Sequence, residues 1–131
     1  MNKAEFRKLN YSLELLALKD IISDKKKELK LKRYQRKLSE EDINKFIEIS
    51  ESRKDLLKNI IKEETKLNYN DAIKFAKENK EKYIQLYNLN HANHFSSILF
   101  YINNNWDLYL NLFENIFKKS AKQIFEELVQ E

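Results

Sequence analysis

The chain of 131 residues contains neither glycine nor proline. Without glycine it lacks the residue on which phosphate-binding loops, dinucleotide-binding turns and strained nucleophile elbows depend, since these need close backbone approach or positive φ. The favoured two-residue β-hairpin turns lose their usual residue too. Helices joined by short asparagine- or serine-containing connections are least affected, so the composition predicts an all-α fold.

Cysteine is also absent, which excludes disulfides and thiolate metal sites. No window approaches the roughly 20 apolar residues of a transmembrane helix, so we expect no membrane span. The start at Met1 is not followed by a basic region and a continuous apolar run, so we expect no signal peptide and a cytoplasmic location. We expect no cofactor.

The length of the chain corresponds to one domain, residues 1–131. Apolar residues at spacings of three and four predict successive helices. Their expected ranges are 3–38, 40–67, 71–88, 92–102 and 105–129. We expect Ser39 to cap the start of the second helix and Asn68 or Asn70 to supply the left-handed residue at its end.

The short join at Leu38–Ser39 predicts that the first two helices are antiparallel neighbours. The expected fold is therefore a four- or five-helix bundle with a long N-terminal antiparallel helical hairpin. Lys, Asn, Ile and Tyr make up 56 residues, as in proteins of AT-rich genomes, so the placement of lysine and asparagine is more informative than their number. The composition resembles that of small accessory proteins, including those carried by phages and other mobile elements.

Charge is missing from one long stretch of a chain that is 35% charged. Residues 83–106 contain no Asp, Glu, Lys or Arg, and residues 83–125 hold ten of the 16 aromatic residues. One interpretation is a buried central helix built from Phe95, Ile98 and the residues that follow. The other is a partly exposed patch that binds a partner or a second copy of the chain, forming a homodimer. The residues of this aromatic patch are Phe100, Tyr101, Trp106 and Tyr109.

Positive charge is concentrated in one segment. Eight of the thirteen residues from Lys25 to Lys37 are Lys or Arg, against the single acid Glu28. On a helix, several of them share one face, which suits binding to an acidic protein surface or to phosphate groups, and Tyr34 could stack on a base. The alternative is an ordinary solvated helix face. The candidate residues of this basic face are Lys26, Lys30, Arg33, Tyr34, Arg36 and Lys37.

His91 and His94 are spaced so that both imidazoles can lie on one side of a helical turn. A stable metal site needs further ligands, and the nearest acids, Glu81 and Asp107, are distant in sequence. We therefore predict no metal site and no catalytic residues. The leading hypothesis is a non-enzymatic binding protein that docks to a protein partner, as an inhibitor, adaptor or immunity-type protein does. The alternative is a nucleic-acid-binding protein that contacts the phosphate backbone.

Overall fold

The computed structural model describes residues 2–30, 39–86, 89 and 92–105, with the side chains of 92–94 and 97 left aside. Every element in these ranges is a helix, and they contain no strand, so the all-α prediction is confirmed. The helices are α1 (Lys3–Lys30), α2 (Glu40–Thr65), α3 (Tyr69–Leu86) and α4 (Ala92–Ile102). The segment 31–38 and the predicted last helix lie outside the described residues.

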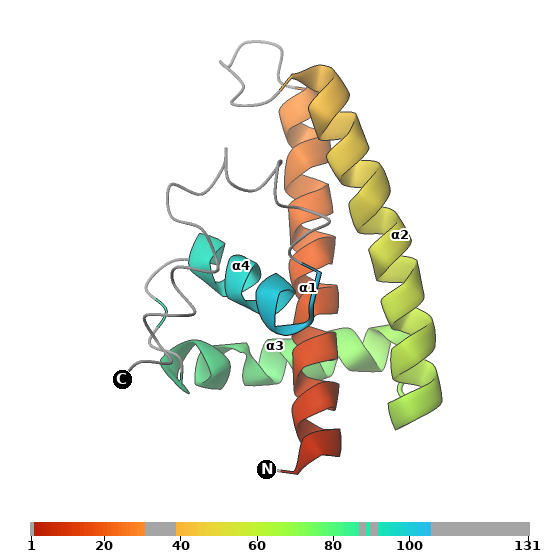
Figure 1. Cartoon of the computed structure of the whole chain (residues 1–131), viewed down its shortest axis with the longest axis vertical. Coiled ribbons are helices and arrows are strands. Elements are labelled where there is room, and N and C mark those ends of the chain that lie inside the picture. Colours follow the sequence, from red (N-terminus) through yellow and green to blue (C-terminus); the bar gives the residue numbers. More distant parts are fainter. Residues whose placement is uncertain (1, 31–38, 87–88, 90–91, 106–131) are drawn as a thin grey trace.

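Helix α1 is the centre of the described fold (Figure 1). Helix α2 runs beside it in the opposite direction, α3 crosses its lower part, and α4 packs on another side. All residues from Ser12 to Leu18 are buried, so this part of α1 is covered on all faces. The spacing of Phe6, Leu9, Leu13 and Leu16 in the sequence predicts an apolar stripe along this helix. Leu9, Leu13 and Leu16 are buried as predicted, but Phe6 is 39% exposed, and the burial of Ser12–Leu18 extends beyond one stripe.

One main core joins the four helices. Fully buried side chains include Leu13, Leu15 and Leu18 of α1, Phe46 and Leu57 of α2, and Phe95, Ile98, Leu99 and Phe100 of α4. Tyr83 of α3 meets Phe95 edge to face at 5.7 Å. A second, smaller cluster of Ile22, Ile43 and Ile47 lies between α1 and α2 towards their far end. Within the described ranges, no helix combines the length and apolar character that crossing a bilayer requires.

Local sequence signals set the helix starts. The Ser39 hydroxyl accepts a hydrogen bond from the Asp42 N–H at 3.1 Å, so Ser39 caps α2 as predicted. Asn68 caps α3 in the same way, since its Oδ1 accepts from the Asp71 N–H at 2.9 Å. The prediction of a left-handed asparagine at this join is wrong at both Asn68 and Asn70, which lies inside α3. Lys66 takes that conformation instead, with φ of 62°.

Replacing Lys66 with glycine should stabilise the protein by about 1 kcal/mol, because a side chain at positive φ costs about 1–2 kcal/mol and glycine loses part of that gain in backbone entropy. Urea unfolding followed by circular dichroism measures the change. Lys62→Gly is the control: it lies inside α2 and should lose about 1 kcal/mol. A destabilised Lys66→Gly variant would contradict the assigned conformation.

Two asparagines form the C-terminal cap of α4. Asn104 has φ of 60°, and its N–H donates to the Tyr101 carbonyl at 3.1 Å. The Asn105 N–H donates to the Phe100 carbonyl at 2.8 Å, which completes a Schellman motif. Asparagine thus occupies the position where most helices have glycine. The predicted helix 92–102 and the joint after it agree with these bounds.

Candidate functional site

A buried carboxylate lies where three segments of the fold meet. Glu14, in the middle of α1, has no exposed surface. The Arg53 guanidinium of α2 donates through Nε to Glu14 Oε2 at 2.8 Å and through Nη2 to Oε1 at 3.3 Å. The Arg53 side chain is only 11% exposed, so both partners of this ion pair are largely removed from water. We call these residues, with the asparagines described next, the Glu14 cluster.

Two asparagines from the turn after α4 complete the Glu14 cluster. Asn103 Nδ2 donates to Glu14 Oε1 at 2.9 Å and to the Asn10 carbonyl at 3.2 Å. Asn105 Nδ2 donates to the same Glu14 Oε1 at 3.0 Å. The carboxylate therefore accepts hydrogen bonds from α2 and from the chain leaving α4. Four donors on its two oxygens leave little acceptor capacity for a ligand.

Burial raises the pKa of the Glu14 carboxyl above its ordinary value of 4.5. The Arg53 guanidinium and the Asn103 and Asn105 amides act in the opposite direction but do not reverse the effect. A carboxyl with a raised pKa can serve as a general acid, but such a group must reach its substrate. Glu14 is enclosed and fully hydrogen-bonded, so its geometry fits a structural role.

The raised pKa predicts how stability depends on pH. A raised folded-state pKa gives a contribution that is complete below pH 4.5 and is lost as the pH rises through the folded pKa. The free energy of unfolding of the wild type, minus that of Glu14→Gln, should therefore fall as the pH rises from 3.5 to 7. Urea titrations at several pH values measure this difference. A difference that rises with pH would mean that Arg53 outweighs burial.

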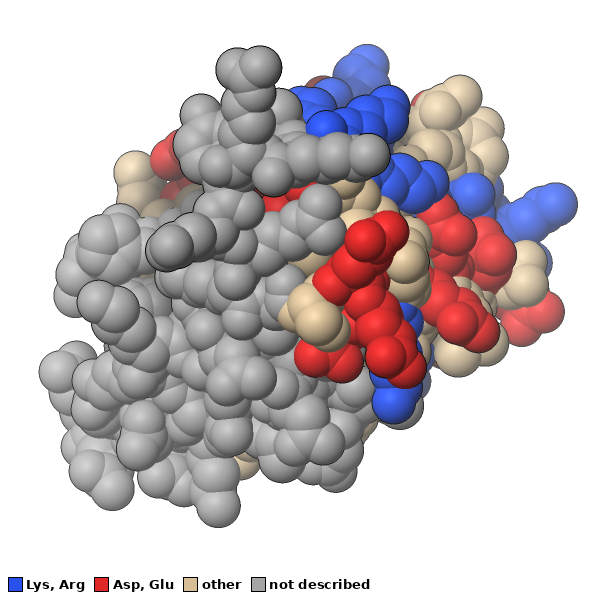
Figure 2. All heavy atoms as spheres, turned by 90° about the horizontal axis from the view of Figure 1, so that it is seen from above, with Lys and Arg blue, Asp and Glu red and all other residues tan. Residues whose placement is uncertain are grey.

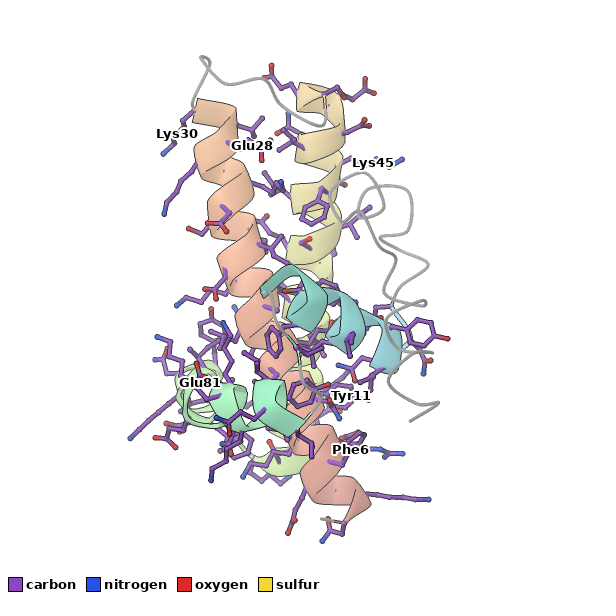
Figure 3. The ribbon with its side chains drawn as sticks, turned by 90° about the vertical axis from the view of Figure 1, so that its left-hand side faces the viewer. Phe6, Tyr11, Glu28, Lys30, Lys45 and Glu81 are labelled. Carbon is purple, nitrogen blue, oxygen red and sulfur yellow. The ribbon has the colours of Figure 1, made fainter. Side chains whose placement is uncertain are left out.

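Only part of the predicted basic face lies in the described residues. Lys26 forms an ion pair with Glu51 at 2.9 Å, and both side chains are about half exposed. Lys30 is exposed and projects from the end of α1 on the side away from α2 (Figure 3). Lys27, next to them, is exposed as well. Arg33, Tyr34, Arg36 and Lys37 lie outside the described residues.

The predicted aromatic patch is not supported at Phe100. Its side chain is fully buried in the main core, because α4 turns Phe95, Ile98, Leu99 and Phe100 inward together. The buried interpretation of this stretch therefore applies to Phe100. Tyr101 is half-buried and packs against the core. Trp106 and Tyr109 lie outside the described residues.

His91 and the side chain of His94 also lie outside the described part, so the structure does not test the histidine pair. Among the residues that it does describe, no group of three or more His, Cys, Asp or Glu side chains is placed to hold a metal ion.

Sequence reasoning missed the Glu14 cluster, although its two charged members interrupt apolar stretches of the sequence. Glu14 is the one charged residue between Lys8 and Lys19, in a segment rich in leucine. Arg53 interrupts the apolar edge of α2 between Ile47 and Leu57. A lone acid inside an apolar helix stripe is a candidate for a buried ion pair, because a buried charge is unstable without a partner. Lys54 follows Arg53 in the same interruption, so the sequence does not single out the base of the pair.

Comparison of the chain with protein-family models, curated proteins and solved structures gives no match.

Proposed function

We propose that this is a non-enzymatic cytoplasmic protein that docks to an acidic surface of a protein partner through the end of α1. The observation that supports the proposal is the exposure and ion pairing of three lysines at the end of α1. Lys27 and Lys30 are exposed and form no ion pair within the described residues. Lys26 has only an exposed partner, and such pairs contribute about 0–1 kcal/mol, so it is readily released to another acid.

The distribution of charge favours this end of the molecule. Helix α1 contains eight bases and five acids, whereas α2 contains five bases and eight acids, so the two helices nearly neutralise each other. Residues 31–38, which link them in sequence, contain four bases and no acid. That equals the net charge of +4 of the whole chain. Seen from this end, acidic and basic side chains lie next to one another on the described surface (Figure 2).

The same proposal includes an arrangement of the helices. Helices α1 and α2, with the segment between them, would form a long antiparallel hairpin with the basic sequence at its end. The remaining helices would complete a four- or five-helix bundle around the lower part of α1. Among the described residues, Lys26, Lys27 and Lys30 are exposed near the end of α1 and lie outside the main core.

Charge reversal at three lysines tests the proposal against a matched control. The docking variant carries Lys26→Glu, Lys27→Glu and Lys30→Glu. The control carries Lys74→Glu, Lys77→Glu and Lys82→Glu, which change exposed lysines of α3 and alter the net charge equally. Capture from the native host, followed by mass spectrometry, should recover a protein partner with the wild type and the control. The docking variant should bind that partner at least about tenfold more weakly, because close charge pairs at interfaces contribute more than 1.4 kcal/mol.

Equal losses in both variants would show that only net charge matters, and equal retention would show that this end of α1 is not the docking surface. Turnover of a substrate without any partner would also contradict the proposal.

A nucleic-acid backbone is the second candidate, because Lys27 and Lys30 lie on one face of α1 and form no ion pair with any residue that the structure describes. Binding to duplex DNA would weaken with salt, with a log–log slope of about −0.9 for each phosphate contacted. A flat salt dependence would reject this candidate.

A further inference from the structure

Apolar packing constrains the position of α2 along α1 mainly at the two ends of the helix pair. The buried apolar residues of α2 are Ile43, Phe46 and Ile47 near its start and Leu57 and Ile61 near its end, and the one buried residue of α2 between these groups is Ser50. Hydrophobic contact is non-directional, so these contacts tolerate displacements that a hydrogen bond does not.

The Glu14 cluster adds a directional constraint on the position of α2 along α1. Arg53 Nε lies 2.8 Å from Glu14 Oε2, and a slide of one turn in either direction would separate them beyond hydrogen-bonding distance. Two buried charges would then have no partner, and removing the partner of a buried charge is strongly unfavourable. Only the observed position of α2 along α1 gives both buried charges a partner.

The same carboxylate fixes α4. This helix has an apolar sequence with four fully or nearly fully buried side chains, so apolar burial does not by itself specify its rotation. Asn103 and Asn105 do, because both side-chain amides donate to the single atom Glu14 Oε1. Asn103 also holds the carbonyl of Asn10, one turn earlier on α1. These three bonds determine where the chain leaves α4.

We propose that the Glu14 cluster is a conformational selector: it fixes the register of α2 on α1 and the exit of the chain after α4, and does not serve to increase stability. Buried ion pairs replaced by apolar residues of similar volume often leave a protein equally or more stable. A selector and a stabilising element therefore differ in what such a replacement does. This inference is independent of the docking proposal.

The double variant Glu14→Met/Arg53→Met separates the two roles. We expect it to unfold at a urea concentration equal to or above that of the wild type. Each single variant, Glu14→Met or Arg53→Met, should unfold at a lower concentration because it leaves one charge buried alone. The exchange protection of the amides of α4 should fall at least about tenfold in the double variant, because the two asparagines lose their shared acceptor.

Cross-linking between introduced cysteines measures the position of α2 along α1. No native cysteine competes in the reaction, because the chain has none. One cysteine replaces Lys26, and the second replaces Glu51, its observed neighbour, or Glu48 or Asp55, about one turn away on either side. With a short bismaleimide, the 26–51 pair should react about tenfold faster than the shifted pairs in the otherwise wild-type protein. In the Glu14→Met/Arg53→Met background, this preference should fall below about threefold.

Retention of the full preference for the 26–51 pair in the double variant would overturn the proposal, since apolar packing would then set the register. A double variant that fails to fold, or that is less stable than either single variant, would also overturn it, because the cluster would then be a stabilising element. Loss of the preference with stability retained is the result that the proposal predicts.

Discussion

Replacing Phe100 with alanine is expected to destabilise the protein by about 3–5 kcal/mol, close to the upper end of single-site effects. The phenyl ring has no exposed surface and lies in the main core beside Phe95, Ile98 and Leu99. Removing it loses the transfer free energy of the ring and leaves a cavity between α4 and α1. Urea unfolding followed by circular dichroism gives the change directly.

Phe100→Leu is the matched control, because it keeps most of the volume and should cost less than about 1.5 kcal/mol. A loss below about 1 kcal/mol for Phe100→Ala would place the ring at the surface, as the patch hypothesis required. Leu86→Ala, at a side chain that is 71% exposed, gives the scale of a surface substitution.

Replacing Arg53 alone with methionine is expected to cost about 3–5 kcal/mol. The methionine fills much of the same space, so the loss comes from the carboxylate left behind. Glu14 would remain fully buried, with Asn103 and Asn105 as its donors but, among the described residues, without the positive charge that Arg53 supplies. Part of the loss should disappear at low pH, where Glu14 takes up a proton.

Lys54→Met is the control for Arg53→Met. Lys54 follows Arg53 on α2 and lies over the Tyr69 ring at 5.5 Å, an interaction expected to contribute about 0.5–1 kcal/mol. Equal effects of the two substitutions would show that Arg53 has no special role. An Arg53→Met variant as stable as the wild type would mean that Glu14 is not buried as a charge.

Helix positions were predictable where the signals are local. Ser39 with three acids after it predicts the start of α2, and the apolar block between two asparagine groups predicts α4. Caps and joints act over a few residues, so the sequence contains the necessary information. The left-handed residue before α3 was assigned to Asn68 or Asn70 because asparagine tolerates positive φ better than lysine. Asn68 serves instead as the N-cap of α3, and Asn70 lies in its first turn.

Contacts between helices were harder to predict from the sequence. The all-round burial of Ser12–Leu18 in α1 arises because α2, α3 and α4 cover different sides of this helix, which no periodicity within the helix specifies. Glu14 and Arg53 are 39 residues apart, and Asn103 and Asn105 are about 90 residues from Glu14. Charged and amide side chains are usually exposed, so the sequence did not predict that these residues form a buried cluster. Of the predicted basic face, the structure places Lys26 and Lys30, and both are exposed.

The central claim is that the uncharged segment after α3 is interior, and native-state hydrogen exchange tests it most directly. The amides of residues 95–102 should exchange only through global unfolding, with the same free energy as those of residues 12–18, because both segments lie in the main core. Exchange of 95–102 through local opening, at a free energy far below the global value, would contradict the account. That result would make α4 a surface element, with its aromatic residues free for a partner.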